Sequence, residues 1–97
     1  MAVFAVTYKY VNDTDAVAAI RPTHRAWLTE RLAAGDLLAS GPMLDMQTAL
    51  LIWQGESLEQ ISKLLNDDPF DIAGLIEERT VQKWNAIFGP FAEHLDA

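Results

Sequence analysis

Apolar and polar residues alternate at the start of the chain, and this pattern predicts a β-strand over Val3–Tyr10. Successive side chains of a strand point to opposite faces. Every second residue therefore shares one largely aromatic face: Phe4, Val6, Tyr8 and Tyr10. The opposite face carries Val3 and Ala5 and is also partly apolar.

Three later segments complete the predicted sheet. Leu37–Ser40 is short and apolar and is followed by the turn Gly41-Pro42. Thr48–Gln54 is a second apolar run that ends at Gly55, and we expect these two segments to pair as a hairpin. Ile76–Trp84 is amphipathic and is predicted to be the last strand.

The segment between the first two predicted strands has apolar residues at helical spacing. After a polar break, we expect a short helical turn over Ala16–Ile20. A longer helix is predicted to begin with Pro22 in its first turn, where a proline loses no hydrogen bond, and to run to Ala34. Its expected apolar stripe is Trp27, Leu28 and Leu32.

Capping signals mark two more helical segments. Ser57 followed by Gln60 is a capping box, in which a hydroxyl and an amide each satisfy a backbone donor, and it predicts a second helix. Asp68 is placed as a helix cap and Pro69 as the first helical residue of a short piece over Phe70–Leu75.

The predicted order is strand, helix, strand, strand, helix, strand. It closes most simply as a ferredoxin-like α+β fold, a four-stranded antiparallel sheet with its helices on one face. We expect one domain over residues 1–97, with Phe88 and Phe91 as apolar anchors and residues 89–97 as a C-terminal tail. Because the uncovered sheet face is partly apolar, we predict a homodimer that resembles an α/β barrel.

Composition narrows the possible functions. The 97 residues include 7 basic and 14 acidic ones, for a formal charge of −7, and such a surface repels nucleic-acid phosphates and anionic lipid. No cysteine is present, which excludes disulfides and thiolate chemistry. The start of the chain lacks the basic segment of a signal peptide, and no apolar run is long enough to span a bilayer. We therefore expect a cytoplasmic protein that binds neither nucleic acid nor membrane.

Four short motifs carry a resemblance to a known family. Along the chain they are Arg21-Pro22-Thr23-His24, Leu38-Ala39-Ser40-Gly41-Pro42, Asp68-Pro69-Phe70 and Ala73-Gly74-Leu75. Together they resemble the YciI-like (YCII-related) pattern of an Arg-x-x-His element, a Ser/Ala-Gly-Pro turn and an Asp-Pro-Phe/Tyr turn. The resemblance implies a dimeric ferredoxin-like fold and a His–Asp pair in a pocket, carried here by His24 and Asp68. Some relatives are similar to enzymes that eliminate halide from ring compounds.

His24 is the main candidate for chemistry, because an imidazole both takes and gives a proton near neutral pH. The alternative is a structural histidine that is hydrogen-bonded to a neighbour. Asp68 would orient the ring and stabilise its charged form. It is equally a routine helix cap, and the two roles can coexist, since a cap uses one carboxylate oxygen. Asp67 is adjacent and could replace it in either role.

The candidates for substrate binding are Tyr8, Arg21, Ser40, Gly41, Pro42 and Phe70. Arg21 is a plausible anion clamp, since a guanidinium binds a carboxylate as a planar fork; alternatively it pairs with Asp13 or Asp15 on the surface. Ser40 would donate to a substrate oxygen, while the turn after it lets backbone N–H groups approach a ligand. Tyr8 would line the pocket or serve as core or dimer contact.

These residues predict an enzyme without metal or other cofactor. His24 and His94 lie in unrelated contexts, and the chain has no Gly-rich phosphate loop. The predicted reaction is elimination or isomerisation of a small anionic or oxygenated ring compound or lactone, with His24 as acid/base and Asp68 as its partner. The alternative is a non-catalytic, dimeric module that binds a small ligand or assists a larger enzyme.

Overall fold

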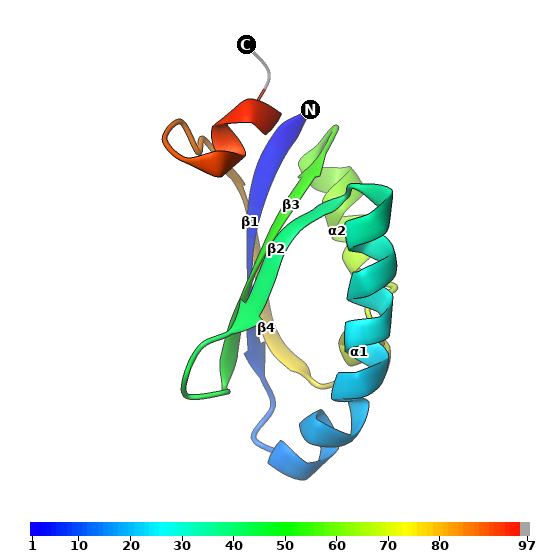
Figure 1. The fold of residues 1–97 in the computed structure, drawn as a ribbon. Helices are drawn as coiled ribbons and strands as arrows, with labels where there is room; N and C mark the ends of the chain where they lie inside the picture. Colours follow the sequence, from blue (N-terminus) through cyan, green and yellow to red (C-terminus); the bar gives the residue numbers. More distant parts are fainter. Residues whose placement is uncertain (96–97) are drawn as a thin grey trace.

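A four-stranded antiparallel sheet forms one layer of the structure, and helices form the other (Figure 1). The computed structural model describes residues 1–95, so the last two residues of the predicted tail lie outside it. The strands are β1 (Ala2–Tyr10), β2 (Leu37–Pro42), β3 (Thr48–Gly55) and β4 (Ile76–Trp84), in the sheet order β2-β3-β1-β4. All three neighbouring pairs are antiparallel. The predicted ferredoxin-like α+β fold is therefore confirmed.

The first helix is longer than the sequence predicts. Helix α1 spans Thr14–Ala34, begins at the cap Asp13 and ends at Gly35, which has the left-handed backbone conformation of a helix end. Pro22 lies inside this helix, so its predicted place in the first turn is wrong. A proline in a helix interior removes a backbone hydrogen bond and bends the helix. Figure 1 shows α1 bent near its start.

The predicted apolar stripe of α1 is only partly right. Trp27 and Leu28 are half-buried against the core, but Leu32 is 58% exposed. The buried residues of α1 are instead Val17 and His24. A histidine thus takes a position on the buried face where an amphipathic helix ordinarily carries an aliphatic side chain.

Two short helices lie between β3 and β4. Helix α2 (Leu58–Leu65) begins with the predicted capping box, since the Ser57 hydroxyl accepts the Gln60 N–H at 3.1 Å and the Gln60 side-chain oxygen accepts the Glu56 N–H at 2.6 Å. Helix α3 (Pro69–Ile72) is a single turn. Within residues 1–95, none of the helices combines the length and the apolar character needed to cross a membrane.

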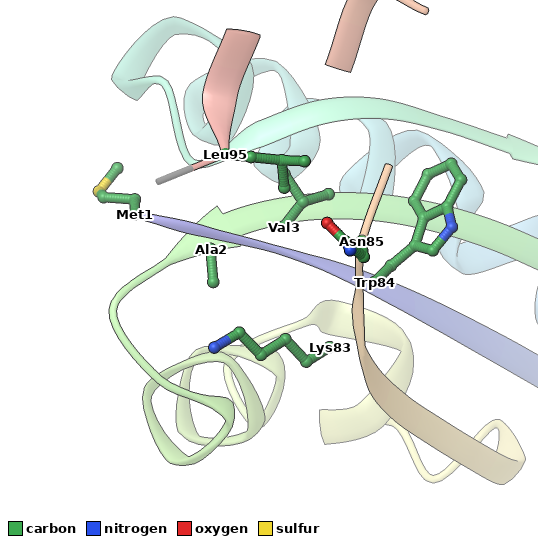
Figure 2. Close-up of a pocket in the computed structure, with 7 residues that line it drawn as sticks. All are labelled: Met1, Ala2, Val3, Lys83, Trp84, Asn85 and Leu95. Atoms are coloured by element: carbon green, nitrogen blue, oxygen red, sulfur yellow. The ribbon is translucent and has the colours of Figure 1, made fainter. Parts of the chain in front are cut away.

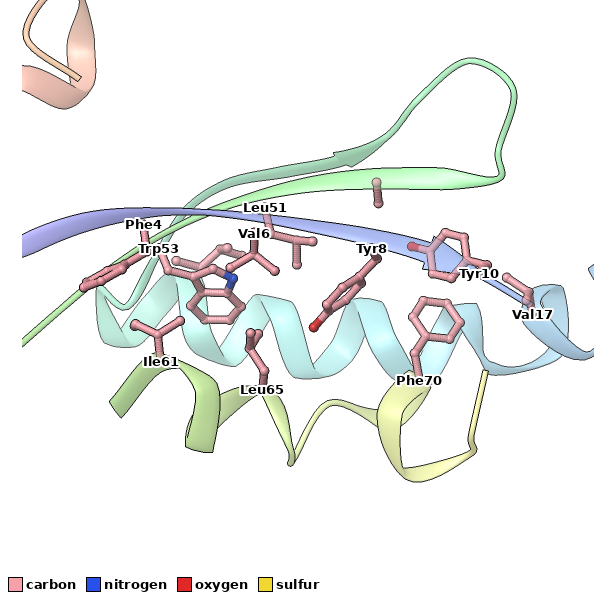
Figure 3. Close-up of a cluster of buried hydrophobic side chains, with 12 residues drawn as sticks. Phe4, Val6, Tyr8, Tyr10, Val17, Leu51, Trp53, Ile61, Leu65 and Phe70 are labelled. Atoms are coloured by element: carbon pink, nitrogen blue, oxygen red, sulfur yellow. The ribbon is translucent and has the colours of Figure 1, made fainter. Parts of the chain in front are cut away.

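The core fills the space between the sheet and the helices (Figure 3). The face of β1 that the alternation marks as aromatic is buried there, because α1 and α2 cover it. The core side chains labelled in the picture come from both layers: Phe4, Val6, Tyr8, Tyr10, Val17, Leu51, Trp53, Ile61, Leu65 and Phe70.

The C-terminal segment covers part of the other sheet face. Figure 1 shows it beside the start of β1, on the side of the sheet away from the helices. It contains the short 3-10 helix Pro90–His94, in which Phe91 packs against Trp84 with 6.2 Å between ring centroids. Val3, on this outer face by strand alternation, is fully buried. Phe88 is 93% exposed, so its prediction as an anchor is wrong.

We expect Gly55→Ala to lower the free energy of unfolding by about 1–3 kcal/mol, as overpacking does. A Cβ at Gly55 would lie 2.6 Å from Gln60 Oε1 and 2.8 Å from Ile61 Cδ1. Gly41→Ala is the matched control, since its Cβ would meet nothing within 4 Å. Urea unfolding of both variants measures the difference, and equal costs would contradict the steric explanation.

Candidate functional site

Asp68 is fully buried and contacts three donors from separate parts of the chain. Its Oδ1 accepts the Phe70 N–H at 2.9 Å, which caps α3 as predicted. Its Oδ2 accepts the Tyr8 hydroxyl at 2.9 Å and lies 3.1 Å from Nε2 of His24. Asp67, the alternative partner, is exposed and lines a different hollow. One carboxylate oxygen therefore caps a helix while the other contacts the imidazole.

The contacts of Asp68 determine which nitrogen of His24 carries the hydrogen. An ionised carboxylate only accepts hydrogen bonds. Burial and the negative charge of Asp68 raise the pKa of Tyr8 well above its ordinary value of 10.0, so Tyr8 remains a neutral donor. Nε2 of His24 then donates to Oδ2, and in the neutral form of the ring Nδ1 carries the free electron pair. Among residues 1–95, no hydrogen bond involves Nδ1.

Aromatic side chains hold the imidazole in place. The Phe70 ring lies 4.3 Å from the His24 ring, centroid to centroid, and Trp27 stacks at 6.4 Å. Trp27 in turn packs on the fully buried Trp53 at 5.6 Å. These contacts and the hydrogen bond to Asp68 leave the ring little freedom to turn, which preserves the assignment of its nitrogens.

A hollow of about 230 Å³ opens beside His24. The predicted site residues that line it come from α1, β2 and α3: Arg21, His24, Ser40, Gly41, Pro42 and Phe70. Tyr8 is not among them, because it is fully buried and is directed to Asp68. An apolar cavity of about 150 Å³ already accommodates benzene, so the hollow has room for one substituted ring.

Four residues of this hollow are absent from the sequence prediction: Tyr10, Arg25, Leu28 and Ala49. Arg25 follows Arg21 by one helical turn, and this spacing is a signal that was available in the sequence. Neither arginine forms an ion pair within residues 1–95, so the alternative pairing of Arg21 with Asp13 or Asp15 is not observed. Two uncompensated positive charges therefore line a hollow in a protein of net charge −7.

A separate hollow of about 390 Å³ lies at the start of β1, as Figure 2 shows. Its walls include Met1, Val3, Lys83, Trp84 and Leu95. Among the described residues that line it there is no histidine, aspartate or glutamate, so these residues offer no acid/base pair of the kind found beside His24. In the part of the chain that the structure describes, no three His, Cys, Asp or Glu side chains are grouped to hold a metal ion.

A family model and two similar solved structures support the fold described above. The family model of the YCII-related domain matches residues 1–85, which include the whole hollow beside His24. One similar solved structure is 5-chloro-2-hydroxyhydroquinone dehydrochlorinase (TftG) from Burkholderia phenoliruptrix AC1100, in complex with 2,5-dihydroxybenzoquinone. It has 24% identity and a TM-score of 0.76, and the match covers 97% of this chain and 99% of that chain.

A second similar structure is protein Atu4242 from Agrobacterium tumefaciens, with 21% identity and a TM-score of 0.51. The match covers 86% of this chain and 92% of that chain. At these identities the likeness concerns the fold alone. No curated protein matches the chain.

We expect Tyr8→Phe to lower the free energy of unfolding at pH 7 by about 1.5–3 kcal/mol, the range for hydrogen bonds to charged groups. The variant removes one donor from the buried Asp68 carboxylate and leaves the ring in place. Tyr10→Phe is the matched control, because the Tyr10 hydroxyl has no hydrogen-bond partner within residues 1–95. Urea unfolding measures the stability of both variants and of the unmodified chain. If Tyr8→Phe is as stable as the unmodified chain, the hydrogen bond from Tyr8 to Asp68 does not stabilise the fold.

The same hydrogen bond predicts how stability depends on pH. Because burial raises the pKa of Tyr8 in the folded state, its contribution is complete below the ordinary pKa of 10.0 and is lost as the pH rises beyond that value. The stability difference between the unmodified chain and Tyr8→Phe should therefore shrink between pH 9 and pH 11, about one unit either side of the ordinary tyrosine pKa. If this stability difference instead grows as the pH rises from about 9 to about 11, the predicted direction of the pH dependence is wrong.

Proposed function

The chain belongs to the YCII-related domain family, and we propose that it is a cofactor-free enzyme that moves a proton on a small, oxygenated ring compound bound as an anion. The observation that carries this proposal is the buried contact of 3.1 Å between His24 Nε2 and Asp68 Oδ2. It lies at the wall of a hollow that is also lined by two arginines with no ion pair within residues 1–95. His24 is the proposed acid/base and Asp68 the residue that orients it.

In the proposed reaction, Nδ1 of His24 takes a proton from the substrate. Asp68 stabilises the imidazolium that forms, because it already accepts the hydrogen on Nε2. The electron pair of the broken bond then forms a new double bond. In an elimination, a leaving group such as halide departs with its own electron pair, and in an isomerisation the imidazolium returns the proton to another atom of the substrate.

The arginines and the β2 turn support an anionic or oxygenated substrate. Arg21 and Arg25 offer planar donors without internal carboxylate partners. Ser40 is exposed and lines the hollow with Gly41, so hydroxyl and backbone donors are in reach of a substrate oxygen. TftG, whose likeness concerns the fold, is a dehydrochlorinase whose solved structure is a complex with 2,5-dihydroxybenzoquinone. A single oxygen-rich ring also suits the size of the hollow.

We further propose that the protein is a homodimer whose subunits pack through the outer sheet face. Leu50 and Trp84 are 38% and 42% exposed, and with Ile52 and Phe91 they border a hollow of about 340 Å³. Ser40 lines this outer hollow as well as the one beside His24. A second copy bound to the outer face would therefore contact β2, the strand that also lines the substrate site.

We expect His24→Gln to reduce kcat/KM at least 100-fold, the usual lower bound for general acid/base catalysis. Turnover is measured on a panel of small lactones and halogenated hydroxyquinols. His94→Gln is the matched control, since His94 lies in the C-terminal 3-10 helix, outside the hollow, beside Glu93. Full activity of His24→Gln would refute the catalytic role. If the panel binds to the unmodified chain but is not turned over, the binding-module alternative is supported.

The homodimer predicts a native mass of twice 10.8 kDa. Leu50→Glu places a charge on the outer sheet face and should give a monomer, because a buried unpaired charge is strongly unfavourable. Ile72→Glu is the control, since Ile72 is 72% exposed on α3 in the helical layer. Light scattering coupled to gel filtration measures each mass. A monomeric unmodified chain at micromolar concentration would contradict the assembly.

A further inference from the structure

Two tyrosines share the inner face of β1 but have different partners. The Tyr8 hydroxyl donates to Asp68, and this residue is fully buried. Tyr10 is 7% exposed and lines the hollow beside His24, yet its hydroxyl makes no hydrogen bond within the described part of the chain. The Tyr10 oxygen is not one of the fully buried side-chain atoms that lack a partner, so it retains contact with solvent. A largely buried residue whose hydroxyl stays accessible at the wall of a hollow has a donor ready for a group that enters the hollow.

The backbone and ring of Tyr10 are held on several sides. Its N–H donates to the Gln47 carbonyl at 2.9 Å, and its pairing partner on β4 shifts because Glu77 is inserted between the partners of Lys9 and Tyr10. Such a bulge increases local twist and redirects side chains. The Tyr10 and Tyr8 rings accordingly lie at 68° to each other. The backbone and ring of Tyr10 are thus positioned by the protein itself.

Phe70 joins Tyr10 to the acid/base pair. Its ring lies 5.0 Å from the Tyr10 ring and 4.3 Å from the His24 ring, between centroids, and all three residues line the same hollow. Figure 3 shows the Tyr10 and Phe70 rings beside one another. Burial raises the pKa of Tyr10, and the positive charge of Arg21 opposes this in part. The phenol is therefore a neutral donor at neutral pH and lies within the field of a cation.

We propose that Tyr10 donates a hydrogen bond to the substrate oxygen on which negative charge develops when His24 takes the proton. The proton goes to Nδ1 of His24, the electron pair of the broken bond is delocalised onto that oxygen, and the Tyr10 O–H bond stays intact. This inference rests on the proposed function and deepens it. It requires a substrate that carries a hydroxyl or carbonyl oxygen conjugated with the reacting bond, because the phenol is complementary to an oxyanion.

The test is a calorimetric titration of the full chain with 2,5-dihydroxybenzoquinone, a ring with four oxygens. We expect Tyr10→Phe to bind about ten-fold more weakly than the unmodified chain, since one hydrogen bond to a charged oxygen is lost. Thr23→Val is the control: it also removes one hydroxyl, from an exposed residue of α1 outside the hollow, and binding should stay within two-fold. Urea unfolding of Tyr10→Phe should match the unmodified chain, because no internal hydrogen bond is lost.

A second measurement needs no variant. In NMR spectra of the unmodified chain, the ring protons of Tyr10 should shift with the quinone more than those of Tyr8. Equal affinity of Tyr10→Phe and the unmodified chain would overturn the inference and leave the proposed function standing. Absence of quinone binding by the unmodified chain would overturn both, because the phenol would then have no oxygenated ring to contact.

Discussion

The buried carboxylate of Asp68 connects three elements that are far apart in the sequence. It is 60 residues from Tyr8 on β1 and 44 residues from His24 on α1, and it caps α3 through the Phe70 N–H. Removing a carboxylate from water is strongly unfavourable unless donors replace the lost hydration. The three donors are therefore a condition for burying Asp68 at all. Sheet, long helix and short helix must meet at this point, and the geometry of the imidazole is a consequence of that requirement.

The structural and functional interpretations of the His–Asp pair are compatible. Oδ1 of Asp68 accepts the hydrogen bond that caps α3, whereas Oδ2 contacts both Tyr8 and His24. The hydrogen bond from the Tyr8 hydroxyl to Oδ2 stabilises the fold whether or not a reaction takes place. A loss of stability on changing Asp68 therefore carries no information about catalysis. What distinguishes the two interpretations is the other side of the imidazole, where the ring borders a hollow and Nδ1 has no hydrogen-bond partner in the described part of the chain.

Local signals in the sequence were sufficient for most of the fold. Strict alternation marks β1, and the caps at Ser57 and Asp68 are short-range chemistry that the structure reproduces. The helix start at Pro22 is wrong because Asp13 caps the chain earlier and Val17 anchors the preceding turns in the core. Leu32 is exposed because β2, beside it, is the edge strand, and no further strand covers that side.

The site was harder to predict from the sequence, for a geometric reason. Alternation places Tyr8 and Tyr10 on the same face, and periodicity cannot tell which one meets Asp68 and which one lines the hollow. That assignment depends on where tertiary packing places Asp68 relative to β1, and strand periodicity does not contain this information. Motif resemblance brought together His24 and Asp68, which do meet. Strand alternation left Tyr8 as either a pocket residue or a core or dimer contact, and in the structure Tyr8 belongs to the core while Tyr10 lines the hollow.

Charge explains how an acidic protein can still favour an anion at this hollow. The net charge of −7 acts over the whole surface and is screened beyond about 8 Å at physiological salt. Arg21 and Arg25 line the hollow itself, so they would act at short range on the proposed substrate, where the attraction between opposite charges is strongest. A long polyanion would meet the acidic surface, whereas a single ring of a size to fill 230 Å³ meets the arginines. The same charge distribution thus disfavours nucleic acid and agrees with the proposal of a small anionic substrate.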